Sequence, residues 1–121
     1  MADALRLKTV RHSLVELGDG NGTTTPGYVA LATTGKAFDF EGVDENCVLL
    51  ITGTANDTVT IMKGDHIQGV KDLELSTTAN KTYVISIPAM EFKNVAGTNK
   101  GCVVIKGAST TKVAVVEIDQ L

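Results

Sequence analysis

The chain has 121 residues, 43% of them hydrophobic, which is enough for a single folded domain with its own core. Its formal net charge is −3, with eleven basic residues scattered among fourteen acidic ones. Because nucleic-acid binding needs clustered lysine and arginine, this distribution argues against a nucleic-acid partner. No run of residues approaches the roughly 20 apolar positions that span a bilayer, so no membrane partner is expected. The N-terminal stretch lacks the apolar core of a signal peptide, and the protein is expected to be made in the cytoplasm and to stay soluble.

The first 27 residues differ from the rest in their pattern of apolar residues and in their glycine and threonine content. They are predicted to form an N-terminal arm followed by a Gly- and Thr-rich loop at 18–27. We expect the arm, residues 2–17, to add as a strand to the edge of a neighbouring subunit or partner. The residues predicted to make this contact are Leu5, Leu7, Val10, Arg11 and Leu14. The alternative is that the arm is the first strand of its own sandwich. Residues 28–121 are predicted to form a single β-sandwich domain.

Two short apolar segments, residues 28–32 and 36–42, follow the loop. Carboxylates gather at and after the end of the second segment, at Asp39, Glu41, Asp44 and Glu45. Paired carboxylates perform acid–base chemistry in glycosidases, whose clefts are also lined with aromatic residues. This chain has three Phe, two Tyr and no Trp, so we interpret the carboxylates as a solvated turn.

Three units with a period of two fill the rest of the chain, at residues 46–64, 72–87 and 101–118. Each joins two runs of Val, Ile, Leu and Thr through a short polar turn, which predicts three β-hairpins. The run CVLLI at 47–51 is apolar on both faces and is predicted to be a central strand or one covered on both sides. The pattern predicts an all-β protein: an antiparallel β-sandwich, or a jelly-roll-like fold, with eight to nine strands and an extended N-terminal arm.

Pro88 lacks a backbone donor and is predicted to end the strand that precedes it. Residues 90–92 are then expected to form a short strand or an anchor, with Phe92 in the core. Residues 94–101 form a turn-rich loop in this interpretation.

The chemistry-bearing residues form no pattern of a known active site. The segment 18–22, which includes Asp19 and Asn21, resembles the opening of a calcium loop but lacks the glutamate that completes such a loop. His12 and His66 have no ligand-spaced partners. Cys47 and Cys102 lie in apolar runs and are interpreted as small buried hydrophobes, with a disulfide between them left open. We expect no catalytic residue, no metal site and no cofactor, and therefore no enzyme.

Several segments resemble the small head-decoration, or cement, proteins of tailed bacteriophages. The resemblance rests on FKNVAGTNKG at 92–101, VVIKG at 103–107, VAVVE at 113–117 and KGDHIQGV at 63–70, and covers roughly residues 46–118. It implies a non-catalytic β-sandwich without a cofactor that sits on the outside of the virion, binds the major capsid protein and stabilises the shell against internal DNA pressure. It also implies a homotrimer around a local threefold axis.

Two other functions fit the same composition. One is a different virion component, such as a tail-tube, head-fibre or baseplate protein. The other is a small carbohydrate- or protein-binding β module, although the shortage of aromatic residues weakens a carbohydrate partner.

Overall fold

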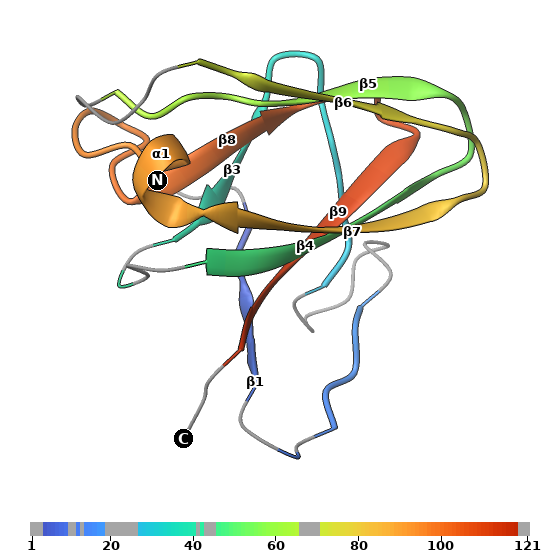
Figure 1. The fold of residues 1–121 in the computed structure, drawn as a ribbon, viewed down its shortest axis with the longest axis horizontal. Helices are drawn as coiled ribbons and strands as arrows, with labels where there is room; N and C mark the ends of the chain where they lie inside the picture. The colour runs from blue at the N-terminus through green and yellow to red at the C-terminus, as the bar shows by residue number, and fades with distance from the viewer. Residues whose placement is uncertain are drawn as a thin grey trace.

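A computed structural model describes residues 4–9, 12, 14–18, 27–40, 42, 46–65 and 71–118 of the chain. The described residues form nine strands and one helical turn (Figure 1). The strands are β1 Leu7–Thr9, β2 Val29–Ala30, β3 Lys36–Asp39, β4 Asn46–Gly53, β5 Asp57–Ile61, β6 Leu73–Thr77, β7 Thr82–Pro88, β8 Cys102–Lys106 and β9 Thr111–Ile118. The predicted all-β sandwich is confirmed.

Two sheets make up the sandwich. The five-stranded sheet has the order β1-β9-β4-β7, with β2 also pairing β9, and the four-stranded sheet has the order β3-β8-β5-β6. The pairs are antiparallel except β1 with β9, which is parallel. The core lies between the two sheets, because its buried side chains come from both, with Leu49 and Val115 on one sheet and Val59 and Val103 on the other.

The three predicted hairpins are wrong as pairings, although their strands are present. β4 pairs with β7 and β9 rather than with β5, and β8 pairs with β3 and β5 rather than with β9. Each short turn therefore carries the chain from one sheet to the other, as Figure 1 shows for β8 and β9. The physical reason is that a strand with one apolar face alternates in the same way whether its sequence neighbour pairs beside it or packs across the core.

These inter-sheet turns are hydrogen-bonded to one another at one end of the sandwich. The backbone N–H of Asn80 donates to the carbonyl oxygen of Gly53 at 2.8 Å, and the N–H of Thr54 donates to that of Thr110 at 3.3 Å. The side-chain oxygen of Asn56 accepts from the N–H of Ala79 at 2.8 Å. The polar residues that suggested hairpins therefore serve to join three turns that are far apart in sequence.

Asp57, the first residue of β5, holds the turn between β8 and β9 in place. Its Oδ2 accepts hydrogen bonds from the N–H of Ala108 at 3.0 Å and from the hydroxyl of Thr111 at 2.8 Å. Thr111 is 1% exposed and is the buried polar residue among the positions that the structure describes. Its hydroxyl is satisfied by this one carboxylate, as a buried polar group requires.

The described part of the N-terminal segment pairs with strands of the sandwich. β1 pairs with β9 in the register Leu7 to Val116, and the residue Ala4 forms a bridge with Phe38 of β3. The residues 4–9 thus contact both sheets of their own domain, which is the alternative in which the arm is the first strand of its own sandwich. Apolar residues at this spacing gain more by covering the free edge of β9 than by remaining in solvent.

Arg6 links the two sheets at this end of the molecule. Its Nε donates to Oε1 of Glu117 at 3.1 Å, and its Nη1 donates to the carbonyl oxygen of Asp39, also at 3.1 Å. Glu117 belongs to β9 and Asp39 to β3, so one guanidinium group joins a strand of each sheet. The fork of guanidinium donors suits this double contact.

Residues 89–92 form a helical turn, α1 Ala89–Phe92, instead of the short strand that was one of the two expectations. Pro88 ends β7 and precedes the helix as its N-cap residue, and the N–H of Lys93 closes the turn on the carbonyl oxygen of Ala89 at 2.8 Å. Ala89 and Phe92 lie three residues apart and both face the core, as helical spacing dictates. Among the residues placed in the structure, no helix is long and apolar enough to span a bilayer.

Candidate docking surface

The outer face of the five-stranded sheet carries several aliphatic side chains. In β4 the inward residues Cys47, Leu49 and Ile51 are buried in the core. Since successive side chains of a strand point to opposite faces, Val48 and Leu50 lie on the outer face. Both are partly exposed to solvent.

The neighbouring strands continue this surface. Leu50 pairs with Val84 of β7 on one side and with Ala114 of β9 on the other, while Val48 pairs with Val116 of β9. Paired residues share a face, so these five residues lie beside one another on the outer side of the sheet, and we call this cluster the apolar face. Val84 is its most accessible member, at 68% exposed. Ala114 is fully buried although it lies on the outer side of β9, so other residues of the chain cover the face at this point, and the accessible part of the apolar face lies toward β4 and β7.

The outer face of the four-stranded sheet is different in character. Val59 and Ile61 of β5 point into the core, which leaves Thr58 and Thr60 on the outer face. Their cross-strand partners on that face are Ser76, Glu74 and Lys106. Val104 of β8 is the partly exposed aliphatic residue there. The outer face of the five-stranded sheet also carries polar side chains, because Val48 pairs with Ser86 and Thr52 pairs with Thr82 and Lys112. The two outer faces differ in that this sheet alone presents the exposed Val84 beside the partly exposed Leu50, and this aliphatic cluster is the surface suited to binding a partner.

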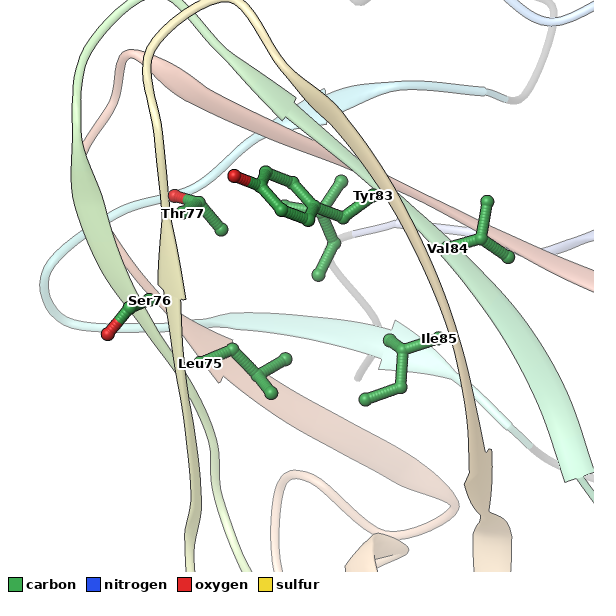
Figure 2. Close-up of a pocket in the computed structure, with 7 residues that line it drawn as sticks. Leu75, Ser76, Thr77, Tyr83, Val84 and Ile85 are labelled. Atoms are coloured by element: carbon green, nitrogen blue, oxygen red, sulfur yellow. The ribbon is translucent and has the colours of Figure 1, made fainter.

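A second apolar feature adjoins the apolar face at β7. Figure 2 shows Leu75 of β6 and Ile85 of β7 pointing toward one another across the space between the two edge strands. Val84 points away on the other side of β7. The cavity between the strands has a volume of about 200 Å³, and we call it the edge slot. The slot is lined by Ile51, Leu75, Ser76, Thr77, Tyr83, Val84 and Ile85.

Tyr83 closes one end of the edge slot. Its phenol oxygen accepts a hydrogen bond from the backbone N–H of Thr78 at 2.9 Å. Hydrogen bonds from Thr78, through its side chain and its backbone, lower the pKa of Tyr83. The contact holds the aromatic ring across the open side of the sandwich rather than out in solvent, which leaves the slot floor apolar.

The five residues of the N-terminal arm that were predicted to contact a partner differ in their exposure to solvent. Leu7 is 8% exposed within β1, whereas Leu5 is 61% exposed and Leu14 is fully exposed. Val10 and Arg11 lie outside the described residues. Phe92, predicted to anchor the core, is 5% exposed and belongs to the core cluster. Of the five arm residues, Leu5 and Leu14 are thus the two that are accessible in the described part of the chain.

The described residues that were candidates for catalysis or metal binding do not form a single site. Cys47 and Cys102 are both buried, no disulfide joins them, and burial, followed by the nearby Glu117, raises the pKa of the Cys47 thiol to about 11. Asp39 lies 3.7 Å from the Arg6 guanidinium, so it is committed to the link between the sheets. His12 is exposed with a positive φ of 65°. Across the described ranges, no cluster of three His, Cys, Asp or Glu could hold a metal ion.

The remaining chemical candidates lie outside the described residues. They are Asp19, Asn21, Glu41, Asp44, Glu45 and His66.

Sequence reasoning missed the apolar face, although a signal for it was present. The run CVLLI was recognised as apolar on both faces, and β4 is indeed a central strand of its sheet. The outward residues of this run are the ones that remain partly exposed. The run VAVV in β9 has the same property, and the two runs are paired through Val48 and Val116.

The apolar face and the edge slot meet at Val84 and belong to the same edge of the molecule. Both are surfaces that gain free energy by being covered, because their exposed atoms are largely hydrocarbon. Comparisons of the chain with models of protein families, with curated proteins and with solved structures found no match.

Proposed function

We propose that this chain is a viral structural protein that binds the outside of a phage capsid shell and stabilises it, with the major capsid protein as its partner. The observation that carries the proposal is the contrast between the two outer faces of the sandwich. A protein that coats a shell needs one adhesive face toward the shell and one hydrated face toward solvent. The apolar face meets the first need and the outer face of the four-stranded sheet meets the second. The segments that resemble phage cement proteins support the same function.

The apolar face supplies the binding energy in this proposal. Burying apolar surface contributes roughly 25 cal/mol per Å², so a face centred on Val84, Leu50 and Val48 yields a modest affinity for each copy. A homotrimer around a local threefold axis, the assembly that the resemblance implies, would present three such faces to the shell at once. Linked contacts multiply, and trimer formation would convert a modest single-site affinity into stable attachment.

The proposed role requires no catalysis and no cofactor. The protein would be made in the host cytoplasm and would act on the exterior of the virion. Its contribution is mechanical: each copy that bridges neighbouring capsid subunits raises the free energy needed to separate them.

The proposal is tested by changing the chemistry of one face without changing its shape. Val48→Thr combined with Val116→Thr replaces two paired aliphatic residues of the apolar face by residues of nearly the same volume. Val104→Thr makes the same change on the outer face of the four-stranded sheet and is the matched control. The probe is an undecorated capsid assembled from the major capsid protein of the same virus, and co-sedimentation measures the bound fraction.

We expect the double variant to bind the capsid about tenfold or more weakly, since each buried methyl group contributes roughly 0.8 kcal/mol or more. The Val104 variant should bind as the wild type does. Far-UV circular dichroism and a urea unfolding curve establish that each variant is folded. Equal binding by all three proteins, or no binding by the wild type, would refute this function.

A further inference from the structure

The strand β7 is an edge strand without the features that protect exposed edges. Within the described residues it pairs with β4 alone, in an unbroken register from Asn46 with Pro88 to Thr52 with Thr82. Residues 82–87 carry no charge, and no bulge interrupts the pairing. Natural proteins blunt free edges with charged side chains, bulges or proline, because an open strand pairs readily with another chain. Here the single proline stands at the last position of the strand.

The other edge strands are protected in these ways. β6 carries Glu74 at its second position, and β1 is three residues long and carries Lys8. β3 begins with Lys36 and ends with Asp39, and the bridge with Ala4 covers part of its edge. β7 is therefore the long, uncharged edge among the strands that the structure describes.

We propose that β7 pairs antiparallel with β7 of a second copy of this chain, about a twofold axis at Val84, so that two five-stranded sheets become one continuous sheet. The sequence of β7 is self-complementary in this register. Val84 lies opposite Val84 and Thr82 lies opposite Ser86 on the outer face, while Tyr83 lies opposite Ile85 on the inner face. Like therefore pairs with like at every position, which is what an isologous contact requires.

Other registers are less favourable. A shift of one residue would place outward side chains opposite inward ones, which the period of two forbids. An axis at Tyr83 would pair Thr82 with Val84, and an axis at Ile85 would pair Val84 with Ser86 and bring Pro88 opposite Thr82. Only the axis at Val84 keeps the apolar pair together on the outer face and keeps Pro88 away from the central pairs.

The same contact would cover the edge slot and enlarge the apolar face. Leu75, Tyr83 and Ile85 line the open side of the sandwich beside β7 (Figure 2), so a second copy seated there shields them from water. On the outer side, the pair Leu50 and Val84 of one copy would continue into Val84 and Leu50 of the other. This twofold contact is distinct from any threefold contact between copies, and it does not depend on capsid binding.

Single cysteines test both the contact and its register. Directly opposite residues of antiparallel strands have Cα atoms about 4.5–5.5 Å apart, within the roughly 4.4–6.8 Å that a disulfide spans. Val84→Cys should therefore form a covalent dimer under mild oxidation. Thr58→Cys, an exposed position on the outer face of the four-stranded sheet, is the control. The wild type is a second control, since its own Cys47 and Cys102 are buried.

The register predicts a further pattern. Thr82→Cys alone and Ser86→Cys alone should not cross-link, because in each dimer the two equivalent positions are about four residues, or roughly 13 Å, apart along the strands. An equimolar mixture of the two variants should cross-link, because residue 82 of one copy faces residue 86 of the other. Non-reducing gel electrophoresis reads out each result, and no capsid is needed.

A mass measurement completes the test. Val84→Lys places two like charges opposite each other at the axis, on a side chain exposed enough for the fold to tolerate it, and Thr58→Lys is its control. Analytical ultracentrifugation should give the wild type and the Thr58 variant at least twice the 12.7 kDa mass of the chain. The Val84 variant should have a smaller mass than either. Cross-linking of Val84→Cys no greater than that of Thr58→Cys, or an unchanged mass for Val84→Lys, would overturn the proposal.

Discussion

At the scale of single residues, a few polar groups hold the turns of the sandwich in place through hydrogen bonds. Asp57 stands at the start of β5 and receives hydrogen bonds from the turn that leads into β9. Gly107 lies close against it, since a Cβ at that position would be 2.9 Å from Oδ2 of Asp57 and 2.7 Å from Leu31. A glycine is required there because the turn packs directly onto the carboxylate.

Replacing Asp57 should therefore be costly. Asp57→Ala leaves the buried hydroxyl of Thr111 without its acceptor, and we expect a loss of about 2–3 kcal/mol in the free energy of unfolding measured in urea. Asp65→Ala is the control, because the Asp65 carboxylate accepts from the N–H of Val95 at an exposed site. That variant should lose less than about 1 kcal/mol. Equal losses would show that the hydrogen bonds of Asp57 do not hold the turn.

The buried thiol of Cys47 makes a separate prediction about alkaline pH. Burial raises its pKa from 9.0 to about 11, so between these values the unfolded chain releases a proton that the folded chain keeps. Stability must then fall as pH rises through this window, by roughly 2 kcal/mol from this one group. Urea unfolding of the wild type and of Cys47→Ala at several pH values measures the difference. The difference in unfolding free energy between the two proteins should be constant below pH 9.0 and should change above it. A difference that stays the same at every pH would contradict the raised pKa of Cys47.

At the scale of elements, the N-terminal segment shows how packing decides between two interpretations of one pattern. Leu7 and Leu14 look alike in the sequence, as apolar residues of one loosely alternating stretch. In the structure Leu7 is buried in β1 against β9, while Leu14 lies in solvent outside any strand. Arg6 then joins the ends of β3 and β9 beside Leu7. The first part of the predicted arm is thus a strand of its own domain.

The difference in burial between Leu7 and Leu14 should appear as a difference in the stability of their alanine variants. Leu7→Ala should cost about 2–4 kcal/mol in the free energy of unfolding, as a buried leucine does. Leu14→Ala should change it by less than about 0.5 kcal/mol, as substitutions at exposed sites usually do. If both variants were as stable as the wild type, β1 would not be anchored in solution, and the interpretation of residues 2–17 as a detachable arm would be restored.

Sequence reasoning located most of the elements but not their partners. The period of two identified the strands that became β4 to β9, because alternation depends on the local pattern alone. The pairing of β4 with β7 and β9 could not be predicted, since Val, Ile and Leu runs such as these pair with one another in many arrangements. The same limit hid the apolar face, which exists only because Leu50, Val84 and Ala114 come together from three strands. The helical turn at 89–92 is too short for its period to be recognised.

At the scale of the whole molecule, the sandwich is asymmetric. The outer face of the four-stranded sheet carries mainly threonine, serine and charged residues, whereas that of the five-stranded sheet carries the aliphatic residues around Leu50 and Val84 beside Ser86, Thr52 and Lys112. Between them, the strands β6 and β7 form the open side of the sandwich (Figure 1), and the edge slot lies between these two strands. The two proposals assign a partner to each of these adjoining surfaces: a second copy of the chain to the edge strand β7 and a capsid shell to the apolar face.

The most direct measurement of the proposed function is cryo-electron microscopy of undecorated capsids mixed with the purified protein. The proposed function predicts ordered density on the outer surface of the shell, with the five-stranded sheet toward the major capsid protein and Val48, Leu50 and Val84 at the contact. It also predicts that the four-stranded sheet faces solvent. Capsids that remain bare, or density in which Thr58 and Thr60 face the shell, would contradict it.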